Sequence, residues 1–129
     1  MQAMDNVGVC RPEDAAKVWA EGLMIRSAAM QYSSMSANLK EKYAKELENT
    51  FPNWVTGMSS PWISGYEIDK IEQTENMYVY YLTFSTATST GPARNYKATL
   101  TVAKEINFWR IINIKTDKEL YPYTGFQSQ

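Results

Sequence analysis

The sequence predicts an α+β fold, with N-terminal helices packed on a curved, mostly antiparallel four-stranded sheet. In the first part of the chain, apolar residues recur at spacings of three and four, which is typical of amphipathic helices. After residue 62, four runs rich in β-branched and aromatic residues follow one another. The breaks between these runs are short enough to join antiparallel neighbours, so a meander of strands is favoured.

Length and composition predict a single domain with one core. The chain has 129 residues, of which 44% are hydrophobic and 21% charged. Both fractions are ordinary for a globular protein and far from those of disordered chains. We expect this domain over residues 12–129, and an N-terminal extension over residues 1–11.

The first helix is predicted over residues 12–30. Pro12 fits the first turn of a helix, and Glu13 and Asp14 complement the helix dipole there. Trp19 and Leu23 lie one turn apart on the apolar face, so both should reach the core.

A second helix is predicted over residues 37–48, because Ser36 can cap it and three large apolar residues follow at helical spacing. The helical period is lost over residues 50–62, which nevertheless contain Phe51, Trp54 and Val55. Large apolar groups are costly to leave in water, so this segment is expected to be an ordered connector.

The strands are predicted over residues 63–73, 76–86, 95–104 and 107–116. The third alternates apolar and polar residues, which indicates one buried and one wetter face. Residues 77–84 are apolar on both sides, as expected for a strand covered by helices on one face. Its other face would be covered by a ligand, a partner or the tail, residues 117–129. Gly65 indicates a bulge or bend.

Charge and residue counts exclude several classes of function. Thirteen basic and fourteen acidic residues give a net charge of -1, which provides no general attraction for nucleic acid. The chain has no histidine, and its single cysteine, Cys10, provides neither an internal disulfide nor a thiolate cluster. No cofactor, metal site or catalytic set is therefore predicted. No run approaches the roughly 20 apolar residues of a membrane span.

Two segments resemble small extracytoplasmic domains of Gram-positive bacteria within the NTF2-like, or cystatin-like, superfamily. They are Asn-Trp-Val-Thr-Gly-Met-Ser-Ser-Pro-Trp-Ile-Ser-Gly-Tyr-Glu-Ile at residues 53–68 and Phe-Trp-Arg-Ile-Ile-Asn-Ile at residues 108–114. The resemblance implies a sheet wrapped around a cone, which holds a ligand, is filled by side chains, or is bypassed by dimerisation. It also implies an extracytoplasmic location, as a lipoprotein or as a trimmed ectodomain. Residues 7–10, which end in Cys10, are similar to the end of a bacterial lipoprotein signal, but no apolar run precedes them.

The function expected from these features is a non-catalytic binding or interaction module at the bacterial cell surface. Its partner would be a small apolar ligand, a protein, or a second copy bound through the sheet. The candidate pocket consists mainly of aromatic residues, with a packing role as the simpler interpretation of each. They are Trp19, Trp54, Trp62, Tyr66, Tyr81, Tyr96, Trp109 and Arg110.

The alternative is a small enzyme of the isomerase or dehydratase type. Catalytic members of the superfamily place acids, tyrosines or histidines inside the cone, and this chain has no histidine. The alternative therefore requires tyrosine and carboxylate groups together in the cone. The candidates are Tyr66, Tyr81 and Tyr96 with Glu67 or Asp69.

Overall fold

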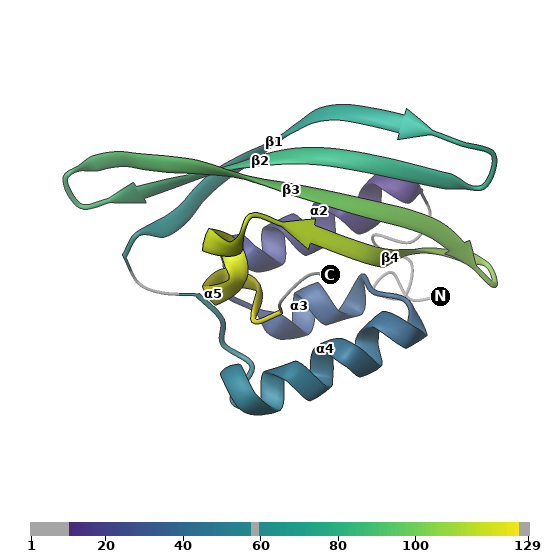
Figure 1. The fold of residues 1–129 in the computed structure, drawn as a ribbon, viewed down its shortest axis with the longest axis horizontal. Coiled ribbons are helices and arrows are strands. Elements are labelled where there is room, and N and C mark those ends of the chain that lie inside the picture. The colour runs from purple at the N-terminus through teal and green to yellow at the C-terminus, as the bar shows by residue number, and fades with distance from the viewer. Residues whose placement is uncertain (1–10, 58–59, 127–129) are drawn as a thin grey trace.

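Helices precede an open, four-stranded antiparallel sheet in the computed structural model, which describes residues 11–57 and 60–126 (Figure 1). The elements are α2 (Pro12–Met24), α3 (Ala28–Ser33), α4 (Ala37–Thr50), β1 (Trp62–Gln73), β2 (Met77–Thr88), β3 (Gly91–Glu105), β4 (Phe108–Thr116), η1 (Lys118–Leu120) and α5 (Tyr121–Thr124). The predicted α+β class is confirmed, and the arrangement is consistent with an NTF2-like cone. Cys10 and nearly all of the expected extension lie outside the described residues.

The prediction of one helix over residues 12–30 was wrong, because the chain turns a corner after Met24. Arg26 adopts a positive φ of 60° there, and Ser27 caps α3 by accepting a hydrogen bond from the Met30 amide at 3.1 Å. The connector holds the corner in place, since the Thr56 amide donates to the Arg26 carbonyl at 3.2 Å. The helical spacing of apolar residues continues through the corner, so the pattern did not indicate it.

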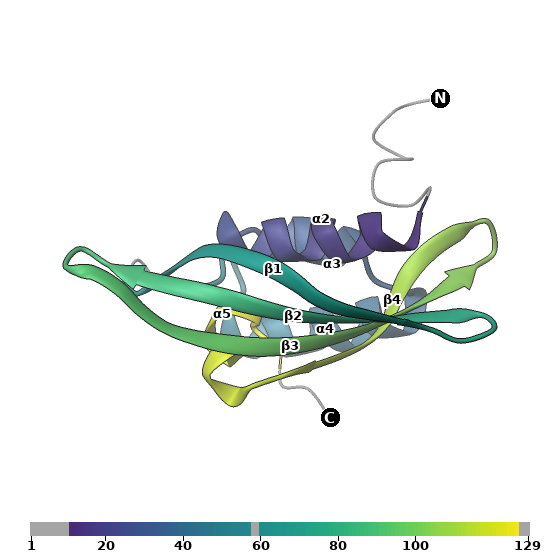
Figure 2. The same cartoon turned by 90° about the horizontal axis from the view of Figure 1, so that it is seen from above.

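The sheet runs in the order β1-β2-β3-β4, and its register shifts in four places. One shift lies between Ile63 and Gly65, as the glycine predicted. Bulges of this kind bend strands and increase their twist. The sheet is accordingly curved, with α2 along one of its faces (Figure 2).

The core lies between this inner face of the sheet and the helices. Tyr80, Leu82 and Phe84 alternate along β2 and are all buried. Trp19 of α2 is fully buried as well, and its ring meets Phe84 edge-on at 5.8 Å between centroids. The expectation that Trp19 and Leu23 reach the core is confirmed.

Two irregular segments complete the fold. The chain between α3 and α4 pairs with the free edge of β4, since the Ser36 amide donates to the Ile111 carbonyl at 2.8 Å. The segment after β4 packs against the connector, where the Tyr123 hydroxyl donates to the Pro61 carbonyl at 2.6 Å. Among the helices of the described residues, none is long and apolar enough to span a bilayer.

Candidate functional site

The predicted pocket residues do not gather around one cavity. Trp19 is fully buried, Trp62 is exposed on the opposite face of the sheet, and the remainder are half-buried. Trp54 packs edge-on against Tyr32, with ring centroids 5.2 Å apart. Trp109 packs in the same way against Tyr78, at 5.4 Å. The indoles therefore have different neighbours and lie in different parts of the molecule.

Arg110 is engaged with the helical layer. Its Nη1 atom donates to the Ser33 carbonyl at 2.9 Å, and its guanidinium lies 5.3 Å from the centre of the Phe108 ring. Ser33 is the last residue of α3, so the arginine donates to one of the carbonyls that every helix end leaves without a partner within the helix. Through this contact, Arg110 holds the end of α3 to β4.

Two of the three tyrosines that the enzymatic alternative needs lie on the opposite face of the sheet from its carboxylates, and the third, Tyr81, lies outside the cone on the same exposed face as the carboxylates. Tyr66 and Tyr96 pair with Phe84 on the inner face, and burial raises the pKa of the Tyr66 hydroxyl. Glu67 pairs with Thr83 on the other face, and the Thr83 hydroxyl donates to Asp69. Glu67 and Asp69 are both exposed, so neither faces the interior with the inner tyrosines.

A buried polar network was missed from the sequence. The Gln31 side chain is fully buried in α3, accepts a hydrogen bond from the Tyr43 hydroxyl at 3.1 Å and donates to Thr56 Oγ1 at 3.1 Å. It thereby links α3, α4 and the connector. Burial raises the pKa of Tyr43 above its ordinary range and that of Tyr80 to about 12. At neutral pH these phenols are therefore hydrogen-bond donors rather than bases.

The outer face, the side of the sheet turned away from α2, carries an exposed polar network. Lys97 Nζ lies 2.7 Å from Thr83 Oγ1 and 3.6 Å from an Asp69 oxygen. Tyr81, predicted for the pocket, also lies here, and its hydroxyl donates to Glu72 at 2.8 Å. Because Tyr81 and Trp19 lie on opposite faces, the structure does not bring these two candidates together.

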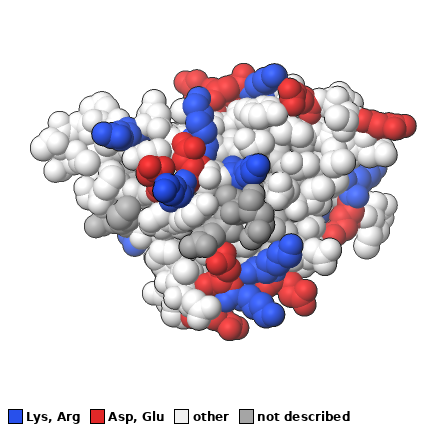
Figure 3. All heavy atoms as spheres, in the orientation of Figure 1, with Lys and Arg blue, Asp and Glu red and all other residues white. Residues whose placement is uncertain are grey.

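Charges on this surface are paired locally. Two hydrogen bonds lower the pKa of the Glu72 carboxyl, and the one from Lys70 has a larger effect than the one from Tyr81. The same bond to Glu72 raises the pKa of Lys70. Basic and acidic side chains lie interspersed on the visible face rather than separated by sign (Figure 3). The visible face therefore has no large field of one sign that would attract a polyanion.

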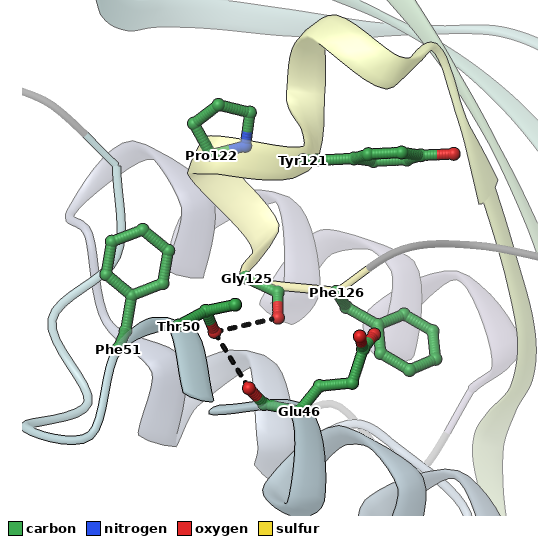
Figure 4. Close-up of a pocket in the computed structure, with 7 residues that line it drawn as sticks. All are labelled: Glu46, Thr50, Phe51, Tyr121, Pro122, Gly125 and Phe126. Atoms are coloured by element: carbon green, nitrogen blue, oxygen red, sulfur yellow. Dashed lines mark hydrogen bonds between the residues drawn. The ribbon is translucent and has the colours of Figure 1, made fainter. Parts of the chain in front are cut away.

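One cavity of about 310 Å³ lies between α4 and the segment that contains α5 (Figure 4). Tyr121 and Pro122 lie on one side of it, opposite Thr50, whose hydroxyl donates to the Gly125 carbonyl at 3.3 Å. Gly125 adopts a φ of 73°, and a Cβ placed there would lie 2.8 Å from Leu47 Cδ2. The cavity thus borders a tightly packed tail.

A second hollow, of about 500 Å³, lies where β1 meets the β2–β3 hairpin. Its lining consists of small and hydroxyl-bearing residues together with one amide. They are Ser64, Ser85, Thr86, Ala87, Thr88, Gly91, Pro92 and Asn95. The predicted Trp62 pairs directly with Ala87, at the border of this hollow. The sequence indicated Trp62, but the neighbours depend on register and were not predicted.

The described ranges contain no cluster of three or more His, Cys, Asp or Glu residues that could hold a metal ion. No protein-family model matches the chain, and no curated protein matches it.

Proposed function

We propose that this protein is an NTF2-like, non-catalytic binding or interaction module at the bacterial cell surface, and that it binds through the outer face of its sheet. The observation that carries this proposal is the contrast along β2. Tyr80, Leu82 and Phe84 are buried beneath the helices, whereas Val79 and Tyr81, which alternate with them along the strand, are only half-buried. A strand with large apolar residues on both faces is typical of a sheet that is covered on both sides.

A protein partner suits the chemistry of this face better than a polyanion does. Val79 pairs with Thr101, and Met77 pairs with Ala103, so the part of this face near the start of β2 is built from apolar and β-branched side chains. Such side chains form tight contacts between sheets. The mixed charges around them are compatible with a second copy, because a two-fold interface brings the same patch against itself. A homodimer through the sheet is therefore the form of the proposal that we would test first.

The cellular location in this proposal rests on the resemblance of residues 53–68 and 108–114 to extracytoplasmic domains of Gram-positive bacteria. An anchor at Cys10 belongs to the same proposal, and that residue lies outside the described part of the chain. The test is labelling of intact cells with a membrane-impermeant reagent. Labelling of the native protein only after lysis would contradict the location.

The binding surface is tested by light scattering of the purified protein. The expected result is a mass twice that of one chain. Thr101→Arg should return the mass to one chain, because the partner copy would have to bury an unpaired charge. Asn49→Arg, at an exposed position of α4, should leave the dimer intact. A monomeric wild type at about 0.1 mM would rule out a homodimer tighter than that concentration.

A small apolar ligand is the other partner class, and a thermal-shift screen distinguishes it from the dimer. A ligand that binds only the folded state raises the melting temperature with its concentration. Stabilisation that Thr101→Arg does not affect would locate the ligand away from Thr101 and from the proposed dimer contact. A monomer without any response to ligands would contradict the proposal of a binding module.

A further inference from the structure

The hollow beside Trp62 has the construction of a ligand site at one end of the outer face. We define the Trp62 groove as the lining residues given above together with Trp62 itself. Its volume of about 500 Å³ lies within the usual range for small-molecule sites. Trp62 is 39% exposed, although a large aromatic side chain is usually buried or used in an interface.

The strand register places the smallest residues beside this indole. Trp62 pairs with Ala87, and Ala87 pairs in turn with Pro92. In the next row, Gly65 pairs with Ser85, and Ser85 pairs with Asn95. A Cβ built on Gly65 would meet no atom within 4 Å. The space over Gly65 is therefore open, and Gly65 borders the groove through its partner Ser85, which lines it.

Polar side chains lie in the second of these rows and at the bulge between the two rows. Within the described residues, no hydrogen bond is formed by the side chains of Ser64, Ser85 and Asn95. The hydroxyls of Thr86 and Thr88, by contrast, donate to the Arg94 and Gly91 carbonyls. A serine hydroxyl both donates and accepts, and the asparagine amide also does both. Three side chains are thus available to a ligand that has both kinds of group.

The lining residues of the groove include no charged side chain. An anionic or cationic ligand would lose hydration without gaining an opposite charge. A purely apolar ligand would leave Ser64, Ser85 and Asn95 without water or partners, which costs about 1–3 kcal/mol for each group fully buried. The remaining class is neutral, has apolar faces and carries many hydroxyls.

We propose that the Trp62 groove binds a neutral saccharide. A pyranose ring presents C–H groups on its face, which pack against the negative face of an indole. Its rim presents hydroxyls that donate and accept, matching Ser64, Ser85 and Asn95. This inference rests on the proposed binding function and specifies a ligand class for it. Dimerisation is measured separately, so the failure of either proposal is distinguishable from that of the other.

The test is an NMR titration of the full chain with three neutral hexasaccharides: cellohexaose, chitohexaose and mannohexaose. The expected result is a saturable shift of the Trp62 indole N–H resonance with at least one of them, at a Kd of about 1 mM. A sulfated hexasaccharide of the heparin type serves as the charged comparison. No shift with any neutral sugar up to about 10 mM would overturn the proposal, as would a shift with the sulfated sugar alone.

Matched variants then locate the site. Trp62→Ala should weaken binding by at least about tenfold, while Trp62→Phe should retain most of it. Gly65→Leu should obstruct the groove, because its side chain would fill the open space beside Ser85. Thr101→Leu places the same leucine side chain elsewhere on the outer face and should bind as the wild type does. Thermal melts check that each variant is folded, and unchanged binding by a folded Gly65→Leu variant would place the sugar elsewhere and overturn the assignment.

Discussion

The two faces of the sheet consist of alternate residues of the same strands, yet they have different surroundings. On β2, Tyr80 and Leu82 are buried beneath the helices, whereas Val79 and Tyr81 are half-buried on the other side. The inner face depends on tight packing, and the outer face carries local polar pairs. This difference indicates that substitutions on the inner face should act mainly on stability, and those on the outer face mainly on binding.

The largest expected effect is that of Trp19→Ala on the inner face. Trp19 is fully buried against Phe84, so its removal should lower the free energy of unfolding by about 3–5 kcal/mol. Trp62→Ala removes the same side chain from the outer face and should cost less than about 1 kcal/mol. Urea unfolding followed by far-UV circular dichroism measures both. Equal costs would contradict the distinction between the faces.

The next largest effect concerns the buried network at Gln31. Gln31→Ala removes the partner of both the Tyr43 hydroxyl and Thr56 Oγ1, so it should cost about 2–3 kcal/mol. Tyr43→Phe is the control, since it removes one bond of the network and leaves Gln31 in place. It should cost about half as much. A larger loss for Tyr43→Phe than for Gln31→Ala would show that the network is not centred on the glutamine.

Two glycines extend the comparison to the backbone. Gly125→Ala should cost about 1–2 kcal/mol, because its φ is 73° and the new Cβ would lie 2.8 Å from Leu47 Cδ2. Gly65→Ala should be neutral or stabilising, since its Cβ would meet nothing within 4 Å. Thermal unfolding of the two variants tests this. A Gly65→Ala variant less stable than Gly125→Ala would contradict the open space over Gly65 beside the Trp62 groove.

Local patterns predicted most of the fold. The four strands, the cap at Ser36 and the bulge near Gly65 all follow from short-range signals, and the structure confirms them. The corner after Met24 was missed because its stabilising contacts come from the connector, about 30 residues away in the chain. Long-range hydrogen bonds of this kind leave no periodic trace in a sequence.

The candidate site was less predictable, because it depends on register. The pattern identified Tyr66 and Tyr81 equally as strand tyrosines, yet the register places them on opposite faces. A shift of one residue exchanges the faces, and among the bulges that set the register only the one near Gly65 was predicted from the sequence. Ser85 and Asn95 were not singled out, because serine and asparagine in strands carry no signal until their neighbours are known.

The smallest expected effect is that of Asp69→Asn in the outer polar network. Asp69 accepts from Thr83 and lies 3.6 Å from Lys97 Nζ, but all three side chains are in contact with water. Exposed ion pairs contribute little, so the variant should lose about 0.5 kcal/mol or less. About 1 M NaCl should remove even that difference by screening. A loss as large as that of Gln31→Ala would mean that the outer network is shielded from solvent, as it would be in a dimer, and the loss should then disappear in Thr101→Arg.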